Sequence, residues 1–263
     1  MNTAVTDRIH AVAEAAASHR VWRSYLLEAR CEFLRLLRTP SYAIPTLLFP
    51  SMFYLLFGVL LNHGKGDAAR YLLATYGSFG VMGVGLFAFG VTVAIERDKG
   101  LLVYKRALPM PPGAYLFAKA AMAVLFAAMV ALLLSLLAAT AGGVSLAAWQ
   151  WALLWLVDVV GVLPFAALGL LVGSLVGGQG APALVNILYL PMAFLSGLWL
   201  PLKLLPAWIG QFAPLLPAYH HAQLALRVVG LADGGLSPAV HLAVLVAFSV
   251  ACFAIARRRL ARA

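Results

Sequence analysis

The residues best suited to chemistry inside this 263-residue chain form one charged stretch between long apolar runs. A loop with charges of both signs beside an apolar turn can dock into a groove of a soluble partner, through contacts that change when the partner closes. We therefore predict that a cytosolic partner acts on this segment. Its residues, called the charged stretch below, are Glu96, Arg97, Asp98, Lys99, Gly100, Leu101 and Leu102.

The chain lacks the motifs of the common hydrolases and nucleotide-binding enzymes. Segment 64–66, Gly-Lys-Gly, lacks the first glycine and the hydroxyl residue of the loop that holds phosphates and magnesium. No His-Glu-x-x-His, no Gly-x-Ser-x-Gly and no pair of carboxylates within one apolar run is present. The adjacent His220 and His221 would point about 100° apart on a helix, and no third metal ligand is evident. We expect no catalytic residue, metal site or bound cofactor on this chain.

Composition indicates a membrane protein that crosses the bilayer several times. Charged residues make up 11% of the chain and hydrophobic residues 63%, whereas soluble domains contain about 25% charged residues. The formal charge of +10 does not predict nucleic-acid binding, because the basic residues lie at the edges of apolar runs. Cys31 and Cys252 are far apart in sequence, so we expect no disulfide. Residues 1–20 lack the apolar core of a cleaved signal peptide, so we expect no such peptide there.

The length of the apolar runs predicts an all-α integral membrane fold with six transmembrane helices. About 20 apolar residues at 1.5 Å per residue cross a hydrocarbon core of about 30 Å. We accordingly expect two parts, a cytoplasmic tail and helix over 1–39 and a transmembrane domain over 40–263. The expected spans lie near 40–61, 71–95, 115–141, 149–176, 181–200 and 236–256.

Residues 19–38 predict an amphipathic helix that lies in the membrane interface. Apolar residues recur at helical spacing, and arginines occupy mostly the remaining positions, where they can face lipid phosphates. A solvated helix packed on another protein is the alternative. Thr39-Pro40 ends the helix, because the residue before proline disfavours helical geometry. The apolar positions are Trp22, Leu26, Ala29, Phe33 and Leu37.

The basic residues predict which side of the membrane each loop faces. With six spans, the termini and the loop after the second span share one side, which receives fifteen of the nineteen Lys and Arg residues. Excess Lys and Arg mark the cytoplasmic side, so we expect both termini in the cytosol and the protein in the cytoplasmic (inner) membrane. A seventh crossing within 201–235 would place the arginines of 257–262 outside.

Segment 201–235 is apolar but broken by prolines, and we predict short helices that dip into the outer leaflet or lie on it. Irregular backbone at membrane depth must be buried in protein or line a water-filled cavity. This segment is therefore expected to form an extracellular re-entrant hairpin between the fifth and sixth spans. Its marker residues are Ser196, Gly197, Pro201, Pro206, Trp208, Pro217 and Tyr219.

A few residues inside the predicted spans are polar or very small. Asp158 is the carboxylate inside a span, where an ionised aspartate costs roughly 2.5 to 3.5 kcal/mol. It needs a partner, for which Asn186 or a backbone group is a candidate, and it could serve either structure or a translocation path.

Gly169, Gly173 and Gly177 repeat every four residues and favour close helix packing over a pore-lining role.

Two regions of the chain resemble the type 2 ABC exporter permeases. The first region is similar to a family pattern that begins with Glu-Arg-Glu-x-Gly and continues with a Pro and then a Gly-Lys pair. Its residues here are Glu96-Arg97-Asp98-Lys99-Gly100, then Leu108-Pro109, then Lys119, which Ala118 precedes in place of the glycine. The second region is similar to Ser-Gly-x-x-x-Pro, Leu-Pro-x-Trp and Pro-x-x-Tyr. It comprises Ser196 to Pro201, Leu205 to Trp208 and Pro214 to Tyr219.

The resemblance implies an ATP-driven exporter subunit without enzymatic activity of its own. It implies a separate nucleotide-binding ATPase that holds ATP and Mg²⁺ and docks at the charged stretch, a permease homodimer or related heterodimer, and contact with membrane lipids. A hydrophobic or amphiphilic substrate, such as a drug, lipid or lipid-linked glycan, would be moved out of the cytoplasm. The alternatives are a proton-coupled secondary transporter that uses Asp158, although no internal repeat supports it, and an intramembrane enzyme, which lacks catalytic residues.

Overall fold

The described part of the protein is built of helices, and no strand occurs within it. The computed structural model describes residues 21–62, 66–107, 111, 113–232 and 235–260. A helical segment over 21–37 is followed by α2 (Pro40–Phe53) and the π-helical η1 (Tyr54–Leu60). The chain continues with α3 (Gly66–Gly85), the π-helical η2 (Leu86–Val91), α4 (Thr92–Asp98), α5 (Leu101–Ala107), α6 (Ala114–Thr140), α7 (Ala148–Leu175) and α8 (Ala181–Leu195). It ends with η3 (Leu202–Leu204), α9 (Ala207–Phe212), η4 (Ala213–Leu215), α10 (Pro217–Val228) and α11 (Pro238–Leu260).

Within the described residues, five helices are long and apolar enough to cross a membrane. They are Pro40–Leu60, Gly66–Asp98, Ala114–Thr140, Ala148–Leu175 and Pro238–Leu260. The all-helical prediction is confirmed, and these helices correspond to five of the six predicted spans.

The predicted span over 181–200 is represented by a shorter helix. α8 has 15 residues, which gives a length of about 22 Å. It ends at Leu195 because Gly197 adopts a φ of 76°, a left-handed conformation that favours glycine, and Pro201 follows. Apolar content alone overestimated the length of this helix, since Leu198, Trp199 and Leu200 are apolar but not helical.

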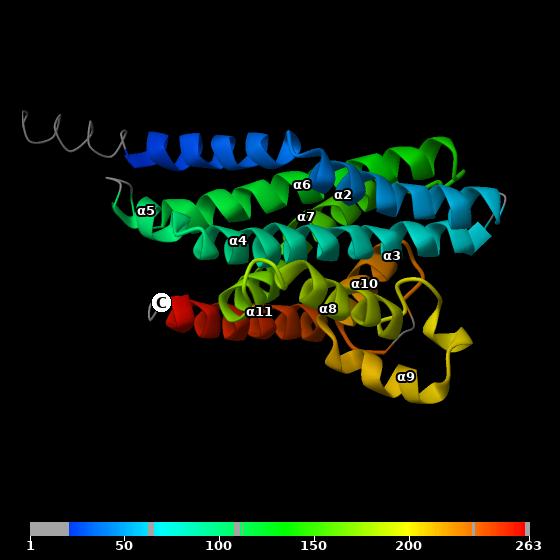
Figure 1. Cartoon of the computed structure of the whole chain (residues 1–263). Helices are drawn as coiled ribbons and strands as arrows, with labels where there is room; N and C mark the ends of the chain where they lie inside the picture. The colour runs from blue at the N-terminus through cyan, green and yellow to red at the C-terminus, as the bar shows by residue number, and fades with distance from the viewer. Residues whose placement is uncertain (1–20, 63–65, 108–110, 112, 233–234, 261–263) are drawn as a thin grey trace, which may run out of the picture.

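The helix from α3 through η2 to α4 lies at the centre of the bundle (Figure 1). In its most apolar window 78% of the residues are buried against other parts of the protein, compared with 28% for α2–η1 and 22% for α11. It packs against α7, α6, α2 and α10. The outer faces of α2 and α11 are apolar and exposed, as expected for helices that contact lipid or another membrane subunit.

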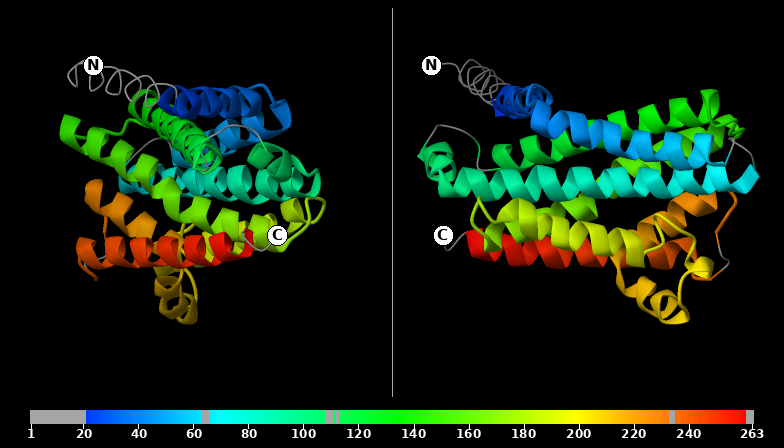
Figure 2. Two further views of the ribbon diagram at one scale, coloured as in Figure 1. Left: turned by 90° about the vertical axis from the view of Figure 1, so that its left-hand side faces the viewer. Right: turned by 45° about the vertical axis from the view of Figure 1, so that its right-hand side comes forward.

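Figures 1 and 2 show which loops, short helices and helix ends lie at each of the two ends of the bundle. α5 and the end of α11 lie at one end, together with the start of the segment 21–37. The turn after η1, the turn between α6 and α7, and α9 lie at the other end. We call these the α5 end and the α9 end.

The segment between α8 and α11 folds as short helices that are interrupted at prolines, as its sequence suggests. Pro206 and Pro217 stand at the starts of α9 and α10. α9 projects from the bundle (Figure 1), and its Trp208 is 56% exposed. α10 is instead buried against α3, α7 and α11. The segment thus has one part outside the bundle and one part within it.

The segment 21–37 packs along α6, and residues 1–20 of the predicted N-terminal part lie outside the described residues. Tyr25 contacts Phe117 edge to face at 5.3 Å, and Phe33 lies 5.5 Å from Phe126. The buried face differs from the apolar stripe proposed from sequence. Ala29 and Phe33 turn toward the protein, whereas Trp22, Leu26 and Leu37 are exposed.

Candidate functional site

Glu96, at the α5 end of the central helix, is buried in a cluster of ionic side chains. Its carboxylate is 3% exposed and pairs with Arg35 from the segment 21–37. Lys119 Nζ, from α6, donates to Glu96 Oε1 at 2.9 Å, and the Tyr115 hydroxyl donates to Glu96 Oε2 at 2.7 Å. Glu96 therefore binds two other elements of its own chain, and its carboxylate is not presented to a partner.

Glu32 completes this cluster from the segment 21–37. It pairs with the fully buried Lys119, and Arg35 Nη2 donates to Glu32 Oε1 at 2.7 Å. Two carboxylates and two cations thus neutralise each other, which is the condition for burying charges at acceptable cost. Arg35 lies at the edge of the cluster, with its side chain 43% exposed. Partial burial of its guanidinium opposes the charge, but the carboxylates of Glu32 and Glu96 outweigh this effect and raise the pKa of Arg35. We call Glu32, Arg35, Glu96 and Lys119 the ion cluster.

Arg97 and Asp98 join the same end of α4 to the junction between α7 and α8. Arg97 Nη1 donates to the carbonyl of Ser174 at 2.8 Å, and Nη2 donates to the carbonyl of Val176 at 2.9 Å. These carbonyls belong to the end of α7, where cations are favourable. The backbone N–H of Gly178 donates to Asp98 Oδ2 at 2.6 Å. The first three residues of the charged stretch therefore connect α4 to its neighbours.

The exposed part of the charged stretch begins at Asp98, whose side chain is 45% exposed. Lys99 and Gly100 are exposed, and Gly100 reverses the chain with a φ of 71°, which a residue with a side chain rarely adopts. Leu101 is 37% exposed and Leu102 half-buried at the start of α5. The structure thus separates the charged stretch into an inward part and an outward part.

α5 is anchored on one side and free on the other. Lys105 Nζ donates to Glu28 Oε1 at 2.5 Å and lies 4.8 Å from the centre of the Tyr115 ring. Val103 and Tyr104 are 66% and 63% exposed. Two large apolar side chains are therefore held outward at the α5 end by a helix that is fixed to both the segment 21–37 and α6.

A groove of about 460 Å³ lies between α2, α3 and α8. Asn186 lines it, but the Asn186 amide donates to the carbonyl of Pro182 in its own helix at 3.1 Å. Such a size and an aromatic lining suit a ligand with a large apolar part. The aromatic lining residues are Tyr42, Phe49, Phe53, Phe79, Phe87, Tyr189 and Trp199.

Asp158 lies elsewhere, buried between α7, α3 and α10. Its carboxylate Oδ1 is 3.9 Å from His221 Nε2 and has no hydrogen-bond partner among the described residues. Nδ1 of His221 is 2.7 Å from the hydroxyl of Ser78. The structure does not bring Asp158 and Asn186 together, and Asp158 lines neither the groove nor the pocket described next.

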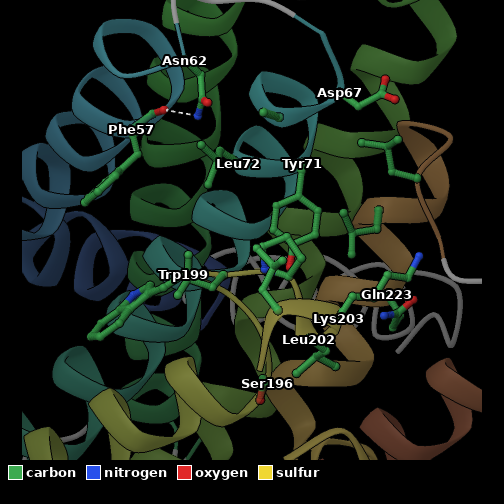
Figure 3. A pocket seen from close by; sticks show the side chains of 16 residues that line it. Phe57, Asn62, Asp67, Tyr71, Leu72, Ser196, Trp199, Leu202, Lys203 and Gln223 are labelled. Atoms are coloured by element: carbon green, nitrogen blue, oxygen red, sulfur yellow. Dashed lines mark hydrogen bonds between the residues drawn. The ribbon is translucent and has the colours of Figure 1, made fainter. Parts of the chain in front are cut away.

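A second cavity, of about 510 Å³, opens at the α9 end between the start of α3, the turn after α8, and α10 (Figure 3). We call it the outer pocket. Ser196 and Pro201 line it, and the Tyr71 hydroxyl donates to the Gly197 carbonyl at its wall at 2.5 Å. Tyr219 packs instead on His220 and His241, with ring centres 5.4 and 6.0 Å apart.

A family model described as ABC-2 type transporter matches residues 25–229 of this chain. The matched region includes the ion cluster, the groove and all of the described lining of the outer pocket except Leu231. The chain belongs to the ABC-2 type transporter family. It is also 28% identical over 221 residues to "Putative transport permease YvfS" of Bacillus subtilis (strain 168), an alignment that covers 82% of this chain and 89% of that protein.

As a member of this family, the protein is a membrane transport permease, and its long apolar helices cross the bilayer more than once. The ABC-2 family implies partnership with an ATPase subunit. The α5 end of this permease presents an exposed apolar helix next to the ion cluster. The groove and the outer pocket are the candidate substrate surfaces of the permease.

Sequence reasoning did not assign roles to several residues of the permease's ion cluster. Glu32 could have been noticed, since it shares a helix face with Ala29 and Leu36, both buried. Lys119 is a cation near the start of an apolar run, which predicts a functional or paired role. The sequence favoured a polar pair at an interface over a metal site for His220 and His221, and the structure places His221 Nε2 3.9 Å from Asp158 Oδ1 inside the bundle.

The glycine repeat lies where α7 crosses the central helix of the permease. A Cβ on Gly169 would be 2.7 Å from the Gly85 carbonyl oxygen, and one on Gly173 would be 2.8 Å from the Gly90 carbonyl oxygen. Gly177 lies beyond the end of α7, where a Cβ would be 3.1 Å from Asp98 Oδ2. Gly169 and Gly173 therefore lie where two backbones approach closely.

Gly169→Ala is expected to lower the free energy of unfolding by about 1–3 kcal/mol, because the new methyl group meets backbone atoms that cannot rotate away. Gly210→Ala is the matched control, since no atom lies within 4 Å of a Cβ there. Denaturation of the purified permease in detergent measures both. Equal stability of the two variants would contradict the close contact.

Asp158→Asn is expected to retain most of the transport activity and its pH dependence, because Asp158 lines neither candidate substrate surface. The amide has the same shape as the carboxylate and keeps a polar group beside His221. Transport into vesicles at several pH values measures this. Loss of transport in a well-folded variant would instead favour a proton-coupled carrier.

Proposed function

We propose that this permease is the membrane subunit of an ATP-driven exporter, and that it moves a hydrophobic or amphiphilic substrate (a drug, lipid or lipid-linked glycan) out of the cytoplasm. A nucleotide-binding subunit supplies ATP hydrolysis with its own Mg²⁺, and this chain supplies the path. The observation that carries the proposal is the exposed α5, with Val103 and Tyr104 turned outward, beside the buried ion cluster.

In this proposal the α5 end faces the cytosol and the α9 end faces outward, in the cytoplasmic membrane. Fifteen of the nineteen Lys and Arg residues then lie on the cytosolic side, including those at both termini. α8 and the residues after it make the sixth crossing, and the segment from Pro201 to the end of α10 is the re-entrant hairpin. The burial of α10 against α3, α7 and α11 supports this arrangement, because re-entrant backbone requires protein around it.

Coupling is proposed to pass from α5 into the bundle through three connections. Lys105 connects α5 to Glu28 of the segment 21–37, Glu96 connects α4 to that segment and to α6, and Arg97 connects α4 to the end of α7. A partner that moves α5 would thus move α4, the segment 21–37, α6 and α7 together. The charged stretch keeps its coupling role, but Glu96, Arg97 and Asp98 transmit motion while Lys99, Leu101 and α5 receive the partner.

The groove between α2, α3 and α8 is the proposed substrate path. Its lining is mostly apolar and aromatic, with Ser41, Thr46 and Asn186 as polar members, and the outer faces of α2 and α8 beside it are exposed. A second copy of the permease that packed against these faces would close the groove into a channel between the two copies. We therefore propose a homodimer with lipid around its remaining apolar surface.

Purification of the tagged permease from native membranes, followed by reconstitution in liposomes, tests the function. We expect an ATPase subunit to copurify, and ATP hydrolysis and export of a fluorescent amphiphile to require both chains. Export that proceeds without the ATPase and follows a proton gradient would contradict the proposal.

A further inference from the structure

The outer pocket carries buried polar side chains whose hydrogen-bonding groups have no partner in the described part of the chain. Gln223, on α10, is 7% exposed, and its amide makes no hydrogen bond there. Ser196 is 3% exposed, and its hydroxyl likewise has no partner among the described residues. Both residues line the outer pocket. The Ser196 hydroxyl has almost no accessible surface, whereas the Gln223 amide is not among the fully buried unpaired atoms of the described residues. Gln223 is therefore the residue whose free hydrogen-bonding groups a ligand in the pocket can pair with.

The lining of the pocket indicates the charge of that ligand. The buried groups, Ser196 and Gln223, are neutral and can each donate and accept hydrogen bonds. Among the described residues of the lining, one acid, Asp67, and one base, Lys203, carry charge, and their formal charges cancel. A headgroup with several hydroxyl groups and no charge matches this set, whereas a lone phosphate or ammonium group does not.

Aromatic side chains provide the remaining wall. Phe57, Tyr71 and Trp199 line the pocket together with several leucines (Figure 3). An aromatic face beside amide and hydroxyl groups suits a compact molecule that has both apolar C–H surfaces and hydroxyl groups, as a sugar ring does. The volume of about 510 Å³ is within the range of small-molecule pockets.

Trp199 connects the outer pocket to the groove, since its side chain lines both. The polar cavity at the α9 end is thus adjacent to an apolar aromatic surface along α2, α3 and α8. A molecule with a polar head and an apolar tail can occupy both surfaces at once, with its head on the outward side of Trp199.

We propose that the outer pocket binds the uncharged, hydroxyl-rich headgroup of an amphiphile whose apolar part lies in the groove. This inference rests on the proposed export function and names the substrate class. Gln223 is the specificity-determining residue, and Trp199 separates the headgroup from the tail.

Binding of three radiolabelled probes with the same octyl tail tests the proposal. Octyl β-D-glucoside, octyl phosphate and octyltrimethylammonium are titrated onto the full-length permease in nanodiscs, and binding to empty discs is subtracted. We expect saturable binding of the glucoside, at least about tenfold tighter than that of the charged probes. Gln223→Leu is expected to weaken glucoside binding about tenfold, because the amide partner is lost.

Two further variants separate recognition from folding. Gln211→Leu changes an exposed glutamine of α9 outside the pocket and should bind as the unmodified permease does. Trp199→Leu should weaken binding of all three probes, because it removes the surface that the head and tail share. Absence of saturable glucoside binding, equal affinity for the three headgroups, or unchanged binding by Gln223→Leu would each overturn the proposal.

ATP hydrolysis by the permease with its ATPase is measured on the same samples. If hydrolysis is coupled but the glucoside does not bind, the headgroup proposal fails while the exporter function stands. If no ATPase associates, the exporter function fails whatever the probes show.

Discussion

Lys119→Met is expected to lower the free energy of unfolding by about 3–5 kcal/mol, since it removes one partner from a buried ionic network. Lys119 is fully buried and pairs with both Glu32 and Glu96. Without it, two buried carboxylates face the single guanidinium of Arg35. Denaturation in mixed detergent micelles and the yield of folded protein in membranes measure the loss.

Two companion variants make this expectation specific to charge. Lys99→Met removes an exposed lysine and should leave stability unchanged. Lys119→Met combined with Glu96→Gln restores equal numbers of acids and bases in the ion cluster and should recover part of the lost stability. If Lys119→Met unfolds like Lys99→Met, the ion cluster does not stabilise the fold.

Val103→Asp is expected to weaken association with the ATPase subunit at least about tenfold, without a loss of permease stability. Val103 is 66% exposed on α5, so an aspartate there costs the free permease little. In a docked complex the new carboxylate would be buried without a partner, which disfavours association. Copurification yield and permease-dependent ATP hydrolysis report the change.

Leu215→Asp is the matched control for this substitution. Leu215 is 75% exposed in η4 at the α9 end and does not line the outer pocket. It should leave ATPase association unchanged. Equal behaviour of the two aspartate variants would contradict docking at α5.

Most of the helical architecture could be predicted from sequence because the bilayer constrains it strongly. A crossing requires about 20 apolar residues and internally satisfied backbone groups, and five such helices lie where hydropathy places them. α8 was the exception. Apolar content continues past Leu195, but the left-handed backbone of Gly197 ends the helix, and hydropathy does not register that conformation.

The candidate site was less predictable because its contacts join residues that are distant in sequence. The charged stretch was recognisable as important, yet Arg35 and Lys119, which bury Glu96, lie 61 and 23 residues away from it. Polarity alone suggested Asn186 as a partner for Asp158, whereas packing of α10 against α7 brings His221 there. A single sequence contains no direct signal for such tertiary pairs.

Site-directed photocrosslinking from α5 tests the central claim, that an ATPase subunit docks there to drive export. A benzoylphenylalanine is placed at position 103 or, as a control, at position 215, and the permease is irradiated in native membranes with and without ATP. We predict a crosslink from position 103 to a nucleotide-binding subunit, with a yield that changes when ATP is bound, and none from position 215. Crosslinks from position 103 to lipid alone, or the same ATPase crosslink from both positions, would contradict the account.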